Sequence, residues 1–588
     1  MILAVIVLLQ VATIQQVTAQ PLLIFITADG NVEGTSAIQR NGNVYTFTSN
    51  LEEASIVIEA DNIVLDGAGF AVKGGGDSIG IVAYDKNAVI IRNVTVENFQ
   101  TGILLGHYRG PDAFLWYDPN PNRPTNCTIN NCHVSNNTNG ISITGGIECR
   151  IIGNQVTNNE KGITFYGSGN VFRNNQMKNN TINFVDMNYE KSDVDASNTI
   201  NGKPIYYLVN QQNKTVPADA SMVRLEGCSN MTVPNLDIKY TYKAISLFNS
   251  SNCKVYGNTL TDNEIGISLR NSSNNAIIGN ELLNNSNDAI EQYDSENTTI
   301  ANNLIRANGG GIDSSGYTAR GSVNAVISSN QIIANGVGIQ AGKDCTIIGN
   351  YIEGNGQHGI YFWDISNSRV YKNNITYNGG CGLSFRIGRN ASITGNDISK
   401  NNVGVGMGDL MGTPSECAIT ENNFAQNTNL AIRIDRDMKD SHIYLNNFID
   451  NNNGSVQVSI KGKFVWKGDE GYNENSTVFP QYAPTYNAWD NGSVGNFWSD
   501  NNSTADGAAY KIADRNIDYH PLLTPIEFCA LELPSTEVPQ ELSELTKSPE
   551  TKSESFSTLI VAVMTLVVVL AVAAGLMVYF KKRKRRNI

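Results

Sequence analysis

Charge and aromatic side chains are scarce in this chain of 588 residues, of which 16% are charged and 8% aromatic. The formal net charge is −13, although the six residues Lys581–Arg586 are all basic. With that tail set aside, the rest of the chain is still more acidic. Nucleic-acid binding requires a basic footprint. The composition therefore argues against a nucleic-acid partner.

Sequence patterns of several familiar catalytic centres are also missing. The chain has no adjacent pair of aspartates and no Gly-His-Gly, which argues against a pectinase-like hydrolase. Its five histidines are scattered, so neither a closely spaced zinc site nor a His-based triad is indicated. The glycines around 74–76 follow no P-loop pattern, which argues against nucleotide binding.

What the chain does have is a repeat. A small residue and an aliphatic one, followed by an Asn-rich turn, recur about every 22 residues from Gly80-Ile81 to Ala431-Ile432. No helical period is sustained between these anchors. Short strands separated by Gly and Asn turns at this spacing predict a parallel β-helix, in which each coil must stack on its neighbours.

Asparagines recur at one corner of the repeat, and we expect their amides to bond from coil to coil as an internal ladder. The expected members are Asn154, Asn174, Asn258, Asn280, Asn302, Asn330, Asn350, Asn373, Asn396, Asn422 and Asn446.

Cysteines also mark the repeat. Cys127, Cys149, Cys253, Cys345 and Cys417 each begin the same phrase, which predicts a column of small structural thiols. Cys127 and Cys149 could lie on neighbouring coils, where a disulfide would depend on the direction of their Cβ atoms.

Composition divides the chain into seven parts. We expect a signal peptide at 1–19, an N-terminal cap at 20–62, β-helix repeats at 63–454 with insertions at about 107–126 and 186–239, a C-terminal cap at 455–525, a disordered stalk at 526–556, a transmembrane helix at 557–580 and a basic cytoplasmic tail at 581–588. The 22 apolar residues from Leu559 to Phe580 would span ~33 Å as a helix. The expected fold class is thus an all-β, right-handed parallel β-helix solenoid with end caps, plus one C-terminal transmembrane helix.

This organisation predicts a single-pass protein of the cell membrane with the bulk of the chain extracellular. Seventeen N-x-[ST] triplets are consistent with an exported glycoprotein.

Several segments resemble the right-handed parallel β-helix proteins with NosD-like or CASH (carbohydrate-binding and sugar hydrolase) repeats. They are Ile63–Gly69, Gly202–Pro204, Gly495–Asp500 and Ile517–Leu522. The resemblance covers about residues 30–525 and implies the fold, but such repeats serve lyases, hydrolases, accessory proteins and surface proteins alike. NosD is associated with copper-site maturation, and no residue-level copper motif is visible here.

Strand alternation places one column of side chains on the outside of the coils. It would stack Glu291 and Asp313 ~5 Å apart, where the two carboxylates could share a proton, bind Ca²⁺, or act as acid and nucleophile on a glycoside. The expected ligand-binding residues are Arg270, Tyr293, Gln340, Tyr361, Trp363 and Arg386 on this face, and Trp116 and Tyr117 in the first insertion. A solvated sheet face with ordinary polar decoration is the alternative.

The preferred hypothesis is an anchored surface protein that binds glycans or has a structural or adhesive role in the cell envelope. Its expected partners are the membrane and extracellular glycans or envelope proteins. A polysaccharide lyase or glycoside hydrolase with Glu291 and Asp313 as catalytic residues is the first alternative, and a NosD-like copper-site accessory protein is the second. No cofactor is expected apart from Ca²⁺ at the acidic pair.

Overall fold

The computed structural model describes residues 22–106, 123–187, 191–315, 322–408, 414–435, 438–461, 463–465, 481–483, 486–501, 508–513 and 515–528. All of them belong to one compact unit, Met1–Leu533. The second unit, Pro534–Ile588, lies outside the described residues, as does the expected signal peptide at 1–19.

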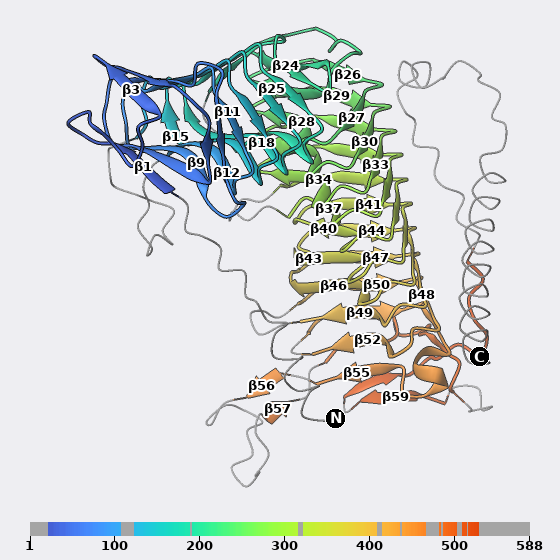
Figure 1. Ribbon diagram of the computed structural model, residues 1–588. Helices are drawn as coiled ribbons and strands as arrows, with labels where there is room; N and C mark the ends of the chain where they lie inside the picture. Colours follow the sequence, from blue (N-terminus) through green and yellow to red (C-terminus); the bar gives the residue numbers. More distant parts are fainter. Residues whose placement is uncertain are drawn as a thin grey trace, which may run out of the picture. The chain divides into compact units, whose positions relative to one another are not determined.

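Each coil contributes short strands, and corresponding strands of successive coils pair in parallel, so that three sheets run along a stack (Figure 1). In the first stack, sheet A consists of β2 (Val32–Glu33), β1 (Leu22–Ile26), β6 (Ala54–Ile58), β9 (Ile79–Tyr84), β12 (Thr101–Gly106), β15 (Asn139–Ile147), β18 (Lys161–Ser168) and β21 (Ile182–Asp186). Sheet B runs from β3 (Ile38–Asn41) to β22 (Asp193–Val194), and sheet C from β5 (Leu51–Glu52) to β23 (Thr199–Ile200).

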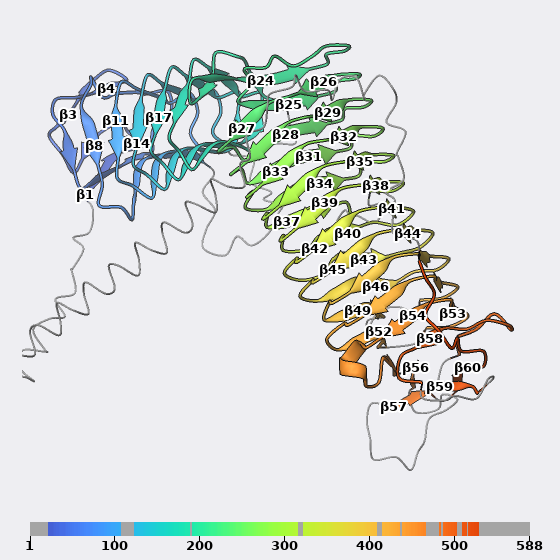
Figure 2. The ribbon, with the colours of Figure 1, turned by 90° about the vertical axis from the view of Figure 1, so that its right-hand side faces the viewer.

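The second stack repeats this plan, and its coils follow one another in chain order (Figure 2). Its sheet D consists of β24 (Lys203–Val209), β25 (Met222–Glu226), β28 (Lys243–Phe248), β31 (Ile265–Arg270), β34 (Asp288–Tyr293), β37 (Gly310–Asp313), β40 (Ile339–Ala341), β43 (Ile360–Asp364), β46 (Cys381–Ile387), β49 (Val403–Met407), β52 (Leu430–Ile434) and β55 (Val458–Ile460). Sheet E runs from β26 (Thr232–Pro234) to β53 (His442–Tyr444), and sheet F from β27 (Asp237–Lys239) to β54 (Asn447–Ile449) and β58 (Phe497–Trp498).

A hairpin joins the two stacks. β23 and β24 pair antiparallel through Asn201 and Gly202, whose φ angles are 50° and 85°. Both values are positive, as a tight two-residue hairpin turn requires, and Asn-Gly is the preferred sequence for it. β24 then pairs in parallel with β25, so the insertion expected at 186–239 contains the connection between the stacks and the first strands of the second one.

Two asparagine ladders run inside the second stack. At one corner Asn373 Nδ2 donates to Asn396 Oδ1 at 3.0 Å, and Asn396 Nδ2 donates to Asn422 Oδ1 at 2.9 Å. The other ladder, which the sequence analysis missed, passes through Asn263, Asn285, Asn308, Asn335, Asn355, Asn378, Asn401, Asn427 and Asn451. Each amide also bonds a carbonyl of the preceding coil, so the ladders satisfy backbone groups that no water reaches.

Two of the residues expected in a ladder are wrong, Asn174 in the first stack and Asn302 in the second. Asn174 and Asn302 have φ angles of 55° and 56° and form the left-handed turn. Their successors, Asn175 and Asn303, carry the ladder instead and are buried. Both sites read Asn-Asn in the sequence, and only the phase of the turn decides which amide points inward.

The C-terminal end of the stack is closed by the segment around β58, which pairs in parallel with β54. Trp498 stacks on Phe448 with ring centroids 4.2 Å apart, and Asn496 continues the ladder from Asn446. The buried Asp518 carboxylate ends the ladder by accepting bonds from the backbone N–H of Asn496 and from the Trp498 indole.

The five cysteines occupy the same position of the coil, as expected, but only Cys127 and Cys149 lie on neighbouring coils and stack. All five residues are buried, and each immediately precedes a three-residue strand, as Cys127 precedes β13 (Thr128–Asn130) and Cys149 precedes β16 (Arg150–Ile152). Register places Cys127 opposite Cys149. Both are free thiols, and the hydrogen bond between them raises the pKa of Cys149 and lowers that of Cys127.

One part of the expected fold class is wrong. The described residues form an all-β parallel solenoid whose only helical element is the 3-10 turn η1 (Asn451–Gly454), and none of their helices could cross a membrane. The described backbone satisfies its hydrogen bonds between coils rather than within a helix. No helix of the described residues corresponds to the C-terminal transmembrane helix that the apolar run predicted, and the segment 557–580 lies outside those residues.

Candidate functional site

The outer face of sheet D brings the expected residues into columns. Register aligns Ser268 with Glu291, Glu291 with Asp313, Asp313 with Gln340 and Gln340 with Tyr361. Two residues further along the strands, Arg270 lies opposite Tyr293. The column exists because every coil presents the same strand phase, so that a regular repeat gives side chains on neighbouring coils a common direction.

The acidic pair is buried and already bonded. Glu291 is 4% exposed, and its Oε1 accepts bonds from Lys243 Nζ at 2.8 Å and Ser268 Oγ at 2.6 Å. Asp313 is 9% exposed, and its Oδ1 accepts bonds from the backbone N–H and the hydroxyl of Ser315 at 2.9 and 2.7 Å. Burial raises the pKa of Asp313, and the Ser315 bonds oppose that rise.

A third carboxylate, Asp288, belongs to this group and was missed from the sequence. Burial raises its pKa to about 7, with further contributions from Asp313 and Glu291. Space for the carboxylate comes from Gly310, where an added Cβ would lie 2.0 Å from Asp288 Oδ1. The sequence pattern assigns outward positions only after each small-aliphatic pair, and Asp288 comes directly before its pair, Ala289-Ile290. The polar Lys243 at the same position in β28 was the available signal.

An aromatic and cationic cluster lies further along the same face. We call Tyr361, Trp363, Arg386 and His358 the aromatic cluster. The Arg386 guanidinium is 4.3 Å from the Trp363 ring centroid and 5.9 Å from that of Tyr361, and the ring of His358 stacks on Tyr361 at 5.7 Å. Trp363 is 46% exposed. A flat, exposed ring flanked by hydrogen-bond donors can bind a ligand that has both apolar and hydroxyl surfaces.

His358 was not among the expected binding residues. Its Nδ1 accepts a bond from the backbone N–H of Cys381 at 3.1 Å. Burial, followed by the charge of Arg433, lowers its pKa. The imidazole is therefore neutral at pH 7, which leaves Nε2–H as its donor.

Among the other expected residues, the Arg270 guanidinium lies 6.0 Å from the Tyr293 ring, and Gln340 Nε2 donates to Ser315 Oγ at 2.7 Å. Trp116 and Tyr117 lie outside the described residues. No three His, Cys, Asp or Glu side chains in the described stretches are arranged as metal ligands, and the Ca²⁺ hypothesis stays a prediction.

An ion network at the junction of the stacks extends the outer column by one residue. Arg224 in β25 is 5% exposed and pairs with Asp186 of β21 at 3.0 Å and with Glu226 at 3.2 Å. The Tyr207 ring lies 5.0 Å from the guanidinium. The sequence analysis missed this network because Arg224 lies in the expected insertion, outside the recognised repeat.

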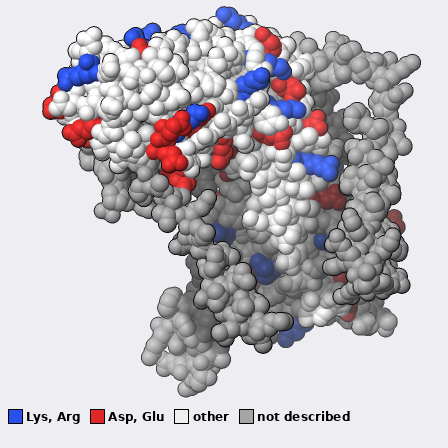
Figure 3. All heavy atoms as spheres, viewed as in Figure 1, with Lys and Arg blue, Asp and Glu red and all other residues white. Residues whose placement is uncertain are grey.

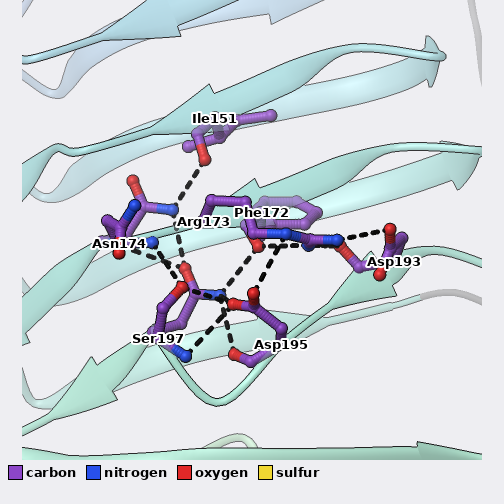
Figure 4. A network of polar contacts seen from close by, with 9 residues as sticks. Ile151, Phe172, Arg173, Asn174, Asp193, Asp195 and Ser197 are labelled. Atoms are coloured by element: carbon purple, nitrogen blue, oxygen red, sulfur yellow. Dashed lines mark hydrogen bonds and ion pairs between the residues drawn. The ribbon is translucent and has the colours of Figure 1, made fainter.

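A second network closes sheet B of the first stack. Arg173 bonds Asp193 at 2.5 Å and Asp195 at 3.0 Å, and these residues gather around the turn that carries Ser197 (Figure 4). A cavity of about 520 Å³ nearby is lined by Ser168, Gly169, Lys191, Ser192 and Asp193. These contacts hold the last coil of the first stack and include none of the expected site residues.

Charge on the visible surface lies in small groups of both signs rather than in one basic or acidic field (Figure 3).

Comparison with known proteins fits the fold. The model of the family described as "Right handed beta helix region" matches residues 24–216, 206–346 and 316–470. No curated protein sequence matches the chain. The periplasmic alginate epimerase AlgG is 14% identical, with a TM-score of 0.28, over 75% of this chain and 81% of its own.

Two further solved structures are similar at the same level. The A-module of the mannuronan C-5 epimerase AlgE4 from Azotobacter vinelandii is 10% identical, with a TM-score of 0.26, over 69% of this chain and 87% of its own. The Dettilon tailspike protein is 13% identical, with a TM-score of 0.26, over 69% and 64%. These values carry no functional argument. The family match, which covers most of the chain, shows that the protein belongs to the right-handed β-helix family.

Proposed function

We propose that this protein binds a polysaccharide along the outer face of sheet D, centred on the aromatic cluster. The observation that carries the proposal is Trp363, a large ring that is 46% exposed on a sheet face where Arg386 packs against it at 4.3 Å. An isolated exposed ring needs no explanation, but a ring with an ordered guanidinium beside it presents an apolar surface and several donors together.

The chemistry suits a sugar chain. The C–H face of a pyranose can lie on the Trp363 ring, while its hydroxyls accept bonds from the Arg386 guanidinium and from Nε2–H of His358. Strands of successive coils are ~4.8 Å apart. An extended polymer along the sheet would therefore meet polar or aromatic side chains at regular intervals, from Gln340 to Arg386.

Binding of a glycan is better supported than a reaction in which Glu291 and Asp313 cleave it. A catalytic carboxylate must reach the scissile bond. Glu291 and Asp313 are almost fully buried and bonded to Lys243, Ser268 and Ser315. One observation favours a second candidate function, a polysaccharide lyase or hydrolase. It is Asp288, which is partly exposed and whose pKa of about 7 suits a general acid or base.

The seventeen acceptor triplets and the apolar segment at 1–19 support a location outside the cytoplasm. A NosD-like role in copper-site maturation stays a prediction, and no metal-ligand group among the described residues supports it.

Glycan binding is testable with the full chain on a glycan array, followed by titration of each glycan that is retained. We expect Trp363→Ala to weaken binding roughly 5- to 160-fold, if a sugar on the ring contributes the ~1–3 kcal/mol that a nucleic-acid base contributes when it stacks on an aromatic side chain. Tyr351→Ala is the matched control, since Tyr351 is 37% exposed but belongs to sheet F. Retention of no glycan, or equal loss in both variants, would refute the proposal.

Reducing-sugar release from acidic and neutral polysaccharides tests the second candidate. Release that disappears in Asp288→Asn and persists in Trp363→Ala would establish catalysis at the acidic group.

A further inference from the structure

Most of the N-x-[ST] triplets between residues 93 and 390 occupy one structural position. Eleven of them begin with an exposed asparagine whose φ lies between 48° and 57°. These are Asn93, Asn126, Asn136, Asn179, Asn213, Asn230, Asn249, Asn271, Asn284, Asn297 and Asn390. They form the left-handed corners between strands, a conformation that asparagine tolerates better than most residues.

The fold separates these asparagines from the buried ones. Two residues after a corner asparagine comes a Ser or Thr that is not buried, as with Thr95 after Asn93 at the start of β11 (Thr95–Glu97). Two residues after a ladder asparagine there is no Ser or Thr, and at the corner that carries Asn373 the residue is an inward apolar one, such as Ile375. None of the buried asparagines in the described stretches therefore begins a triplet, whereas the corner triplets present both their amide and their hydroxyl to solvent.

The triplets also avoid the proposed binding face. Among the described residues no triplet asparagine lies within a strand of sheet A or sheet D. Asn249 and Asn271 come directly after β28 and β31, at the edge of sheet D. Between residues 298 and 452, the part of the chain that forms the coils of the aromatic cluster, the only triplets are those of Asn374 and Asn390.

We propose that the exposed corner asparagines are sites of N-glycosylation and that the outer face of sheet D stays free of attached glycan. In the reaction the Asn Nδ2 bonds to the anomeric carbon of an oligosaccharide, the bond from that carbon to the phosphate oxygen of a lipid-linked donor breaks, and Nδ2 loses one proton. The donor is a lipid phosphate or diphosphate oligosaccharide. The proposal requires export but does not depend on what the binding face recognises.

The hydrogen bonds of the corner side-chain amides predict which corners carry glycan at the highest occupancy. The side-chain amides of Asn126, Asn136, Asn179, Asn249 and Asn271 make no hydrogen bond within the described structure, so attachment there costs no contact. Amides elsewhere are engaged, as in Asn93 with Asp66 and Asn297 with Asn274, both at 3.1 Å. Attachment at the engaged corners would displace these bonds, so we expect lower occupancy there.

Glycopeptide mass spectrometry tests the proposal on the full chain, produced in a cell that N-glycosylates its exported proteins. We expect attached glycan at Asn136, Asn179 and Asn249, and none on peptides that contain the buried Asn258 or Asn401. Thr138→Val should remove the glycan from Asn136 alone, whereas Thr138→Ser, which keeps the triplet, should retain it. Both variants change an exposed side chain, and a retained β-sheet circular dichroism spectrum shows that they fold.

Unmodified corners in an exported and folded chain would overturn the proposal. So would attachment confined to Asn374, which belongs to a strand of sheet F rather than to a corner. Glycan at Asn136 in Thr138→Val would show that the triplet is not what directs the modification.

Discussion

Replacing one ladder asparagine by alanine tests whether the amide ladders hold the coils together. Asn401 is fully buried, and its Nδ2 donates to the carbonyls of Ile375 and Ser399 at 2.8 and 3.1 Å and to Asn427 Oδ1 at 3.3 Å. Its Oδ1 accepts from the backbone and side-chain amides of Asn378 at 3.0 and 2.9 Å. Asn401→Ala removes all five bonds.

The bonds lost set the expected cost. The backbone N–H of Asn378 is left buried without an acceptor, which costs ~1–3 kcal/mol. The other lost bonds contribute ~0.5–1.5 kcal/mol each, and less where one donor is shared. We therefore expect Asn401→Ala to lower the free energy of unfolding by ~3–5 kcal/mol.

Asn402→Ala is the matched control, because Asn402 is the next residue, is exposed and has no side-chain hydrogen bond in the described chain. It should change the free energy of unfolding by less than ~0.5 kcal/mol. Denaturant unfolding measures both variants, and hydrogen exchange at the Asn378 amide reports the local effect. Equal losses in the two variants, or an Asn378 amide as protected as in the parent chain, would refute the reasoning.

Three further predictions concern the site and the packing of coils. The pKa of the Asp288 carboxyl is about 7 in the folded chain, against an ordinary value of ~4, so the folded chain holds this proton more tightly than the unfolded chain does. The contribution of the protonated carboxyl to stability is therefore complete below pH ~4 and is lost as the pH rises through 7. Asp288→Asn should therefore reduce the drop in melting temperature between pH 5 and pH 8, and an unchanged drop would contradict the assignment. Gly311→Ala should destabilise the chain by ~2 kcal/mol or more, because the added Cβ would lie 2.1 Å from the Gly338 carbonyl oxygen, whereas Gly75→Ala, with open space around it, should be neutral in the same thermal unfolding assay. Arg224→Met leaves the carboxylates of Asp186 and Glu226 without their cation and should cost ~3–5 kcal/mol at pH 7, a loss that shrinks at pH 4 as the carboxylates protonate; a loss independent of pH would exclude the electrostatic cause.

The repeat made the coils predictable because a single phrase fixes both the strand phase and the register. Glu291, Asp313 and Gln340 could be aligned from sequence alone, since each follows the same small-aliphatic pair. Asn174 was assigned wrongly because the turn phase is hidden wherever two asparagines are adjacent.

The remaining features of the site depend on distances between side chains of different coils, which a periodic sequence pattern does not give. Glu291 accepts a bond from Lys243, whose strand lies two coils away along the sheet. The pKa of Asp288 is raised first by burial and then by the charges of Asp313 on the next coil and Glu291 on its own strand, in the space that Gly310 leaves. Arg224 lies beyond the recognisable repeat and meets Asp186 only because a hairpin joins the stacks.

Because like strands pair in register from coil to coil, separation along the solenoid is quantised. Deleting one whole coil between the acidic group and the aromatic cluster would shorten the gap by a single strand spacing of ~4.8 Å and leave the contacts inside each group unchanged. The number of coils therefore sets the distance between the acidic group and the aromatic cluster. Gain or loss of one coil in evolution could change the length of ligand that spans both, without any change within either group.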